Sequence, residues 1–189
     1  LLRRAVNMQE ERHMDILKSQ KLFFDPLINE KKELPDCNGI YVLCSRDLSY
    51  LPKSMSSLDY EYYENYPVVY VGISGKQGLR KRYNNHFRGT ARNSTIRKSI
   101  GALLGCSREY YRDGKYKFQK TDEEKISYLM NSNFVFFYWC LKSFSKKEMD
   151  EMEMKMIEYF HPPLNLFKNN SPINRDFRSK LKILRDRKQ

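Results

Sequence analysis

Arg82 and His86 place a permanent cation and a titratable imidazole four positions apart, directly after a glycine-punctuated loop. Leu79, Tyr83 and Phe87 recur in the same stretch at the spacing of one helical face. Residues four apart lie on the same side of a helix, so Arg82 and His86 border that buried face. Fixed positive charge after a glycine loop is typical of a phosphate site. A basic surface helix with a satisfied histidine explains the same residues equally well.

A carboxylate, Glu153, falls inside the apolar arc of a second predicted helix. This helix covers residues 145–160, begins at a Ser-Lys-Lys-Glu capping box and ends before a Pro-Pro pair. A carboxylate on a buried face is costly unless it is paired or bound to a metal. One carboxylate suits Mg²⁺ that keeps most of its waters, whereas a salt bridge to Lys or Arg needs no metal. The arc consists of Met149, Met152, Met156, Ile157 and Phe160.

Three short apolar segments must position these side chains. They cover residues 40–44, 67–71 and 133–141, and their β-branched and aromatic composition predicts strands. The first two are expected to form a hairpin. Its connection, residues 45–66, is polar and rich in tyrosine, and we interpret it as a long insertion.

The remaining chain predicts helices and connectors. A helix capped by Asn93 or Ser94 is expected over residues 94–104, and a short one from a capping box at residue 121 to about residue 130. Residues 106–120 are interpreted as a charged, aromatic linker. Residues 3–24 have the periodicity of an amphipathic helix, and residues 168–189 predict a short terminal helix or a flexible basic tail.

The charge distribution favours a polyanionic partner. Among 189 residues, Lys and Arg number 35 against 23 Asp and Glu, which gives a net charge of +12. The segment from residue 76 to residue 98 contains no acidic residue, and its cations are Lys76, Arg80, Lys81, Arg82, Arg88, Arg92, Arg97 and Lys98. We therefore expect these side chains to contact nucleic acid.

Cysteine spacing and hydropathy exclude other classes of protein. The four cysteines do not have the spacing of a zinc site, and the three histidines do not complete one. We expect no zinc and no structural disulfide, with reduced cysteines in a cytoplasmic protein. No apolar run approaches the ~18 residues of a membrane span, so no membrane association is expected.

Five elements in chain order resemble the signature of the GIY-YIG endonuclease superfamily. Gly39-Ile40-Tyr41 matches the first tripeptide and Tyr70-Val71-Gly72 the second. The helix then supplies Arg82 and His86, and the later helix supplies Glu153. Asn165 follows twelve residues after Glu153 and closes the pattern.

The resemblance implies an α+β fold, an α/β sandwich in which a small three-stranded antiparallel sheet is flanked by helices. It divides the chain into an N-terminal helical extension (1–34), a nuclease domain (35–167) and a basic tail (168–189). The long connection 45–66 is similar to that of restriction-enzyme members, which favours a restriction or defence nuclease. DNA-repair and mobile-element nucleases, and a non-catalytic module that binds nucleic acid, are the alternatives.

The resemblance also implies hydrolysis of DNA phosphodiester bonds with one divalent metal, Mg²⁺ or Mn²⁺. Tyr41 would orient or deprotonate the attacking water, and Tyr70 would position the phosphate or the water. Arg82 would stabilise the developing charge of the phosphorane, and His86 would hydrogen-bond a tyrosine or relay its proton. Glu153 would bind the metal. The sixth residue of the expected site, which would brace it by hydrogen bonds, is Asn165.

The other cations of the basic segment would position the duplex without reading its sequence. The insertion, the linker 106–120 and the tail are where base-reading side chains would lie. Because each chain carries one site, cutting both strands requires a dimer or two encounters, so a homodimer is a further hypothesis.

Overall fold

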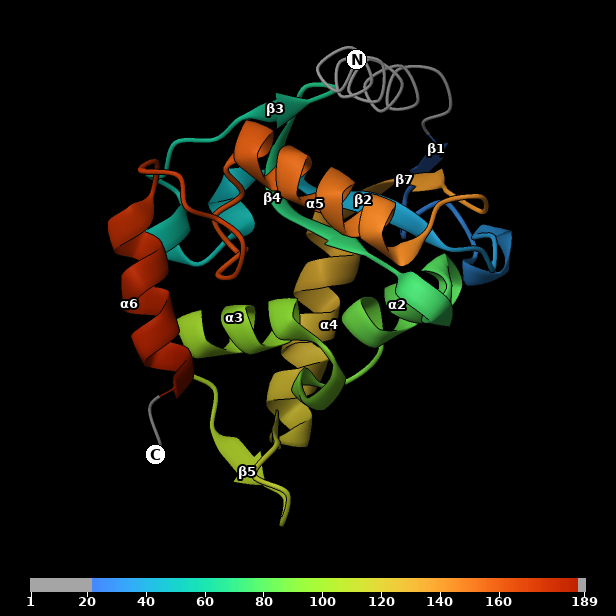
Figure 1. Cartoon of the computed structure of the whole chain (residues 1–189). Coiled ribbons are helices and arrows are strands. Elements are labelled where there is room, and N and C mark those ends of the chain that lie inside the picture. Colours follow the sequence, from blue (N-terminus) through green and yellow to red (C-terminus); the bar gives the residue numbers. More distant parts are fainter. Residues whose placement is uncertain (1–21, 187–189) are drawn as a thin grey trace.

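An antiparallel sheet of five strands forms the centre of the computed structural model, which describes residues 22–186 (Figure 1). The strand order is β1-β7-β2-β4-β3. A separate ribbon pairs β5 with β6. The strands are β1 Leu22–Phe24, β2 Gly39–Ser45, β3 Tyr62–Tyr63, β4 Tyr66–Ile73, β5 Arg108–Tyr110, β6 Tyr116–Phe118 and β7 Phe134–Cys140.

Helices surround the sheet, and short 3-10 turns occupy the connections. The α-helices are α2 Leu79–Phe87, α3 Thr95–Leu103, α4 Lys120–Asn133, α5 Lys146–Phe160 and α6 Arg175–Asp186. The 3-10 turns are η1 Lys31–Glu33, η2 Leu48–Tyr50, η3 Lys53–Met55, η4 Gly75–Gln77 and η5 Ala91–Asn93. Within residues 22–186, none of the helices has the length and apolar character needed to cross a membrane.

The mixed α and β class is confirmed, and the three predicted strands are the central β2, β4 and β7. The prediction of only three strands is wrong, because β1 and β3 extend the sheet at its two edges. β1 also replaces the end of the helix predicted over residues 3–24: Phe24 pairs with Phe136 of β7 and is buried. The rest of that predicted helix lies outside the described residues.

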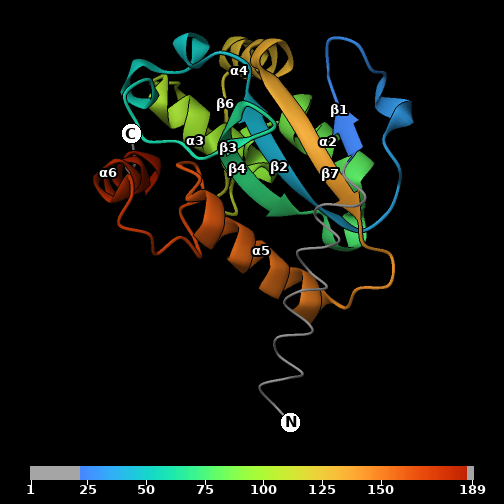
Figure 2. The ribbon, with the colours of Figure 1, turned by 90° about the horizontal axis from the view of Figure 1, so that it is seen from above.

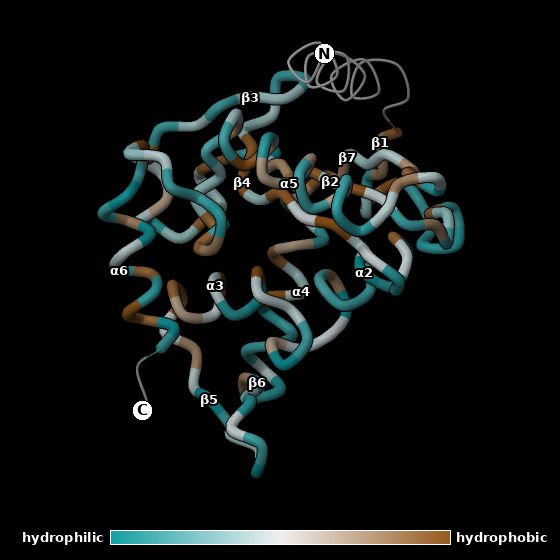
Figure 3. The backbone as a smooth tube through the Cα atoms, viewed as in Figure 1, coloured by the Kyte–Doolittle hydropathy of each residue, from teal (hydrophilic) through white to brown (hydrophobic). Residues whose placement is uncertain are grey.

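The sheet lies between two helical layers (Figures 1 and 2). One face packs against α5, and its core joins Val42 and Trp139 to Met152 of the helix. The other face packs against α2, α3 and α4, with Leu43, Tyr83 and Ile100 in its core. Figure 3 shows that hydrophobic residues concentrate on the central strands, while much of the outer surface of the helices is hydrophilic. The expected sandwich architecture follows from this arrangement.

A β-bulge in β4 sets which side chains face the site. Leu43 pairs with Tyr70 but Cys44 pairs with Val68, so Val69 has no partner on β2. One extra residue reverses the alternation of side chains along a strand. As a result Val69 and Tyr70 both belong to the core on the α2 side. Sequence alternation alone could not predict this reversal.

Two connector predictions are corrected by the structure. Residues 106–120, expected to be a charged, aromatic linker, contain the β5–β6 hairpin. The following helix begins at Lys120 rather than at the expected capping box, and it continues to Asn133 because Ile126 and Met130 pack in the core. The predicted caps at Ser94 and Ser145 are confirmed.

A disulfide joins Cys37 to Cys140, and the prediction of no structural disulfide is therefore wrong. Cys37 precedes β2 and Cys140 ends β7, and these two strands are neighbours in the sheet. The two cysteines are 103 positions apart, so nothing in their spacing indicated that they lie close together. The other two cysteines, Cys44 and Cys106, are free and buried.

Candidate active site

Tyr41 is the centre of the candidate site. It lies in the middle of β2 and is fully buried on the α2 side of the sheet. Its partner on β4 is Gly72. A Cβ atom at Gly72 would lie 2.5 Å from the Tyr41 hydroxyl, so any larger residue there would displace the phenol. Gly72 of the second tripeptide therefore leaves the space that the Tyr41 phenol of the first tripeptide occupies.

α2 directs two polar side chains at the Tyr41 hydroxyl. Nε of Arg82 donates to the hydroxyl at 3.1 Å, and Nε2 of His86 lies 2.7 Å from it. The helix places them one turn apart because its apolar face, Leu79 and Tyr83, packs into the core. The sequence prediction that both groups border this face is confirmed, and His86 is fully buried.

His86 continues a hydrogen-bonded chain into α3. Its Nδ1 lies 2.7 Å from Oγ of Ser94, the residue that also caps α3 by accepting from the Arg97 amide. Tyr41, His86 and Ser94 therefore form a continuous relay whose direction depends on which ring nitrogen carries the proton. When Nε2 is unprotonated, the Tyr41 hydroxyl donates to His86 while it accepts from Arg82.

Burial decides the resting protonation states. The pKa of Tyr41 is raised far above its usual range by burial, against the opposing influence of Arg82 and with smaller contributions from Tyr70 and Glu153. The pKa of His86 is lowered well below 6.5 by burial and by the positive charges of Arg82 and Arg97. The resting site thus holds a neutral phenol beside a neutral imidazole and a charged guanidinium.

Tyr70 lies beside Tyr41 on the neighbouring strand, with 6.3 Å between the ring centroids. Its hydroxyl is 3.2 Å from Oγ1 of Thr95, the first residue of α3. Tyr70 is 7% exposed, and Thr95 is exposed. Of this pair only Thr95 faces solvent, so the pair forms the wall between the surface and the fully buried Tyr41 and His86.

Glu153 lies on α5, and its charge contributes a small part of the raised pKa of Tyr41. Its side chain is only 13% exposed, and its Oε2 accepts a 2.7 Å hydrogen bond from Nζ of Lys168. Lys168 also binds Oδ1 of Asp150 at 3.1 Å. Glu153 was predicted to lie on the apolar side of its helix, with a salt bridge as the alternative to a metal. The carboxylate is both largely buried and paired with a lysine.

The Glu153 carboxylate, which now pairs with Lys168, could supply one oxygen ligand to a hard divalent cation. Within the described part of the chain, no three His, Cys, Asp or Glu side chains cluster as a complete metal site. One carboxylate is sufficient for Mg²⁺, which prefers oxygen ligands and retains several waters. Glu153 would hold such an ion, and substrate phosphate would complete its ligands.

Asn165 braces the outer edge of β4. Its Oδ1 accepts from the Val71 amide and its Nδ2 donates to the Val71 carbonyl, both at 2.8 Å. The neighbouring Leu164 amide donates to the Val69 carbonyl at 3.1 Å. This segment therefore pairs with β4 as an additional strand would, and it fixes the backbone between Tyr70 and Gly72.

Apart from Arg97, the residues predicted to contact DNA fall into two groups. Lys76, Lys81 and Arg88 are exposed, so their contacts with DNA stay predictions. Arg80, Arg92 and Lys98 are partly engaged within the protein, respectively with the Leu34 carbonyl, with Tyr111 and Asp113, and with the Tyr116 ring.

Arg97 is fully buried, and the prediction that it contacts DNA is wrong. Its Nη2 forms a 2.6 Å ion pair with Glu123, and its Nη1 donates to the His86 carbonyl at 3.0 Å. A buried arginine requires such pairing, because an unpaired charge is too costly in the core.

Ser94, Thr95 and Lys168 were not predicted as site residues. The position of Ser94 before a helix identified it only as a cap, and its contact with His86 depends on how α3 packs on α2. Lys168 lies in a segment already rich in cations, so its contact with Glu153 had no separate signal in the sequence. Tertiary packing creates all three contacts.

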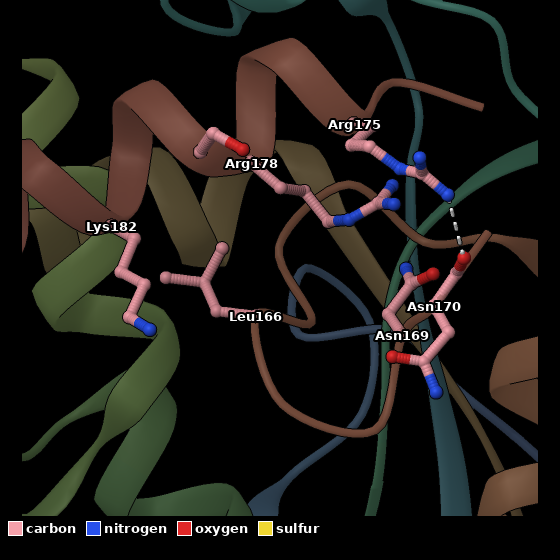
Figure 4. Close-up of a pocket in the computed structure, with 7 residues that line it drawn as sticks. Leu166, Asn169, Asn170, Arg175, Arg178 and Lys182 are labelled. Atoms are coloured by element: carbon pink, nitrogen blue, oxygen red, sulfur yellow. Dashed lines mark hydrogen bonds between the residues drawn. The ribbon is translucent and has the colours of Figure 1, made fainter. Parts of the chain in front are cut away.

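A second polar hollow lies beside α6 (Figure 4). Arg175 and Arg178 extend toward the segment that carries Asn169 and Asn170, and Arg175 donates to the Asn170 carbonyl at 3.4 Å. Arg178 is 6% exposed and donates to the carbonyls of Ser171 and Ile173. The other lining residues are Leu166, Ser179 and Lys182. The hollow thus extends the basic surface along the segment that follows Asn165.

Comparison with known proteins identifies the family. Neither the search of curated proteins nor the search of solved structures gave a match. A family model described as the GIY-YIG catalytic domain matches residues 39–187, which covers every predicted catalytic residue and extends through α6. With this match over most of its length, the chain belongs to the GIY-YIG catalytic domain family.

Proposed function

We propose that this protein is a Mg²⁺-dependent DNA endonuclease that hydrolyses phosphodiester bonds. One observation carries the proposal: Arg82 and His86 converge on the Tyr41 hydroxyl at 3.1 and 2.7 Å. The phenol and the imidazole are fully buried and the guanidinium is half-buried, and such a costly cluster of polar groups is typical of a functional site. The family includes endonucleases, and the net charge of +12 favours a polyanionic substrate.

Tyr41 and His86 would remove a proton from the attacking water. The raised pKa of Tyr41 makes the free phenolate a rare species, so Tyr41 needs a partner that takes its proton. We assign that role to His86, which resists protonation in the free protein but would be stabilised as a cation by the phosphate and its developing negative charge. The water proton would pass to the Tyr41 oxygen while the Tyr41 proton passes to Nε2. The new P–O bond forms on the water oxygen, and the bond to the leaving oxygen breaks.

Arg82 would stabilise the negative charge that develops on the non-bridging oxygens of the phosphate in the transition state. Its guanidinium is always charged, and Tyr41 raises its pKa further. Tyr70 would orient the phosphate from the exposed wall, and Asn165 would keep its strand in place. Glu153 would bind Mg²⁺ or, as the alternative, Mn²⁺. When bound, the ion would neutralise negative charge on the phosphate and on the leaving oxygen.

The basic surface would position DNA independently of its sequence. Lys76, Lys81 and Arg88 are exposed near α2, and Arg175 and Lys182 line the hollow of α6. We propose a restriction or defence enzyme, because the long connection between β2 and β4 is similar to that of restriction-enzyme members. The alternative is a DNA-repair or mobile-element nuclease. Discrete fragments favour the former, and cutting confined to damaged or branched DNA favours the latter.

The proposal is tested by incubating supercoiled plasmid with the protein and Mg²⁺ at low salt. Wild-type protein is expected to nick or linearise the plasmid, and Glu153→Ala is expected to lose about 100-fold or more of the rate. Glu158→Ala is the matched control, since Glu158 lies on the same helix but is exposed. An inert wild-type protein over a range of salts and divalent metals would leave only a non-catalytic binding module.

Cutting of both strands in one encounter needs two sites, so we propose a homodimer on DNA. Sedimentation of the protein–DNA complex tests this point. A monomeric complex that still makes double-strand breaks in one encounter would contradict it.

A further inference from the structure

The β5–β6 hairpin projects from the body of the molecule, below α3 and α4 in Figure 1. Its base is packed, since Phe118 is fully buried and Tyr116 is 8% exposed. Its tip is solvated: all residues from 109 to 115 are exposed. Two-stranded ribbons are marginally stable in water by themselves, so the buried base must hold this one in place.

The exposed tip carries two tyrosines and two cations, Arg112 and Lys115, together with the carboxylates of Glu109 and Asp113, which pair with Lys117 and with Lys115. Arg92 stacks over the Tyr111 ring, 4.1 Å from its centroid, and forms a 3.0 Å ion pair with Asp113. These contacts fix the turn from the side of the basic segment. Arg112 has no ion pair or hydrogen bond with another residue between 22 and 186, so its charge is available to an external anion.

Further cations gather around Tyr116 at the base of the hairpin. Lys98 and Arg108 lie over its ring, at 5.2 and 4.8 Å from the centroid. Arg185 of α6 approaches the same place and contacts Ser99 at 3.4 Å. Burial lowers the pKa of Lys98, and the charges of Arg185 and Lys115 lower it further. Like charges held this close repel one another, and a bound polyanion relieves that repulsion.

The buried ion pair between Arg97 and Glu123 connects the hairpin to α2, the helix that carries His86. The Glu123 carboxylate accepts from the Phe118 amide at 3.0 Å and from the Ala91 amide at 2.7 Å. Its partner Arg97 donates to the His86 carbonyl. Phe118 also packs directly over Gly101, where any Cβ atom would collide with its ring. The orientation of the hairpin is therefore fixed relative to His86.

We infer that the β5–β6 hairpin contacts duplex DNA on one side of the phosphate that is cut. This inference rests on the proposed function and adds the hairpin as the structural element that would lie in a groove of the DNA. A two-stranded ribbon fits the major groove of B-DNA, and Arg112 at its tip can reach phosphates or base edges there. Thr95 of the site wall and Gly101 at the hairpin base lie on one helix, about 9 Å apart. The ribbon adds at most ~17 Å, so contacts fall within roughly eight base pairs of the cut.

Fluorescence anisotropy with a labelled duplex of about 30 base pairs tests the inference, with EDTA present so that nothing is cut. The variant Tyr111→Ser/Arg112→Ser is expected to bind about tenfold more weakly than wild type, with a salt slope smaller by about 1. Lys125→Ser/Tyr128→Ser on α4 is the matched control, because both residues are exposed and remain outside the hairpin. Its affinity and salt slope are expected to equal those of wild type.

The outcomes separate this inference from the proposed function. Wild-type protein that binds and cuts DNA, with a hairpin variant of unchanged affinity and salt slope, overturns the inference and leaves the nuclease intact. Wild-type protein that neither binds nor cuts DNA overturns both. If the double variant unfolds, the single variant Arg112→Ser decides by the same two measurements, since it keeps the stack of Arg92 on Tyr111.

Discussion

At the scale of single residues, the site depends on how far each titratable group is removed from water. Tyr41 and His86 are both fully buried, and burial moves both toward their neutral forms. Because both groups are neutral at rest, the free protein does not bear the cost of an isolated buried charge at either of them. Arg82 donates to the same hydroxyl and is permanently charged, so the candidate site places a fixed positive charge beside two neutral groups.

The lowered pKa of His86 makes stability depend on pH. Below the unfolded value of 6.5, the unfolded chain binds a proton that native His86 refuses, so stability is present above this pH and is lost as the pH falls. The contribution reaches at most about 1.4 kcal/mol per pH unit. Urea denaturation between about pH 7.5 and 5 is expected to show a shallower dependence for His86→Gln than for wild type. Identical slopes in the two proteins would contradict the assignment.

Local sequence patterns are sufficient to identify much of the candidate site. Tyr41, Arg82 and His86 could be predicted because strand and helix periodicities place them at fixed positions on their elements. The burial of Arg97 could not be predicted, because Arg97 pairs with Glu123 from another helix. Glu153 was ambiguous for a related reason: its apolar neighbours indicated burial, but its partner Lys168 lies in a different segment.

At the scale of elements, β4 and α3 position the chemistry. The bulge at Val69 turns Tyr70 toward α2, and Asn165 fixes the same strand from outside. α3 brings Ser94 and Thr95 to the relay and to the exposed wall. The three central strands were predictable because each is a compact β-rich segment. The short β1, β3 and β5–β6 segments were not, because pairing with distant residues determines them.

The Arg97–Glu123 pair is expected to matter for stability more than for DNA contact. Removing one partner leaves the other buried and unpaired, so Arg97→Met is expected to lower the free energy of unfolding by about 3–5 kcal/mol. The double variant Arg97→Met/Glu123→Leu is expected to recover part of that loss. Urea denaturation measures both values, and a single variant as stable as wild type would be incompatible with the buried pair.

The disulfide between Cys37 and Cys140 closes a long loop and limits the unfolded chain. Closing such a loop is typically worth about 2–4 kcal/mol. Oxidised protein is therefore expected to unfold at higher urea than Cys37→Ser/Cys140→Ser, and mass spectrometry after alkylation under denaturing, non-reducing conditions should count two labelled cysteines rather than four. Four labelled cysteines in freshly purified protein would show that the bond does not form.

At the scale of the whole molecule, the basic surface and the catalytic site share one framework. α2 carries the catalytic groups and exposed cations, while α3 connects Tyr70 with the base of the hairpin. α6 packs on α3 through the fully buried Leu181, so the predicted tail contributes a helix to the body. The family match extends through this helix as well. DNA binding is expected to fall steeply with salt, because phosphate contacts release counterions.

The most direct test of the account is single-turnover cleavage of DNA in Mg²⁺ by Arg82→Leu and Arg82→Lys, with affinity measured in parallel. Arg82 is proposed to stabilise the charge that develops on the phosphate oxygens in the transition state, so Arg82→Leu is expected to lose about 100- to 1000-fold in rate. Arg82→Lys should recover part of it, because charge returns without the planar fork. Both should bind DNA within about threefold of wild type, since one charge contact among many contributes little to affinity. Cleavage by Arg82→Leu at the wild-type rate would contradict the account.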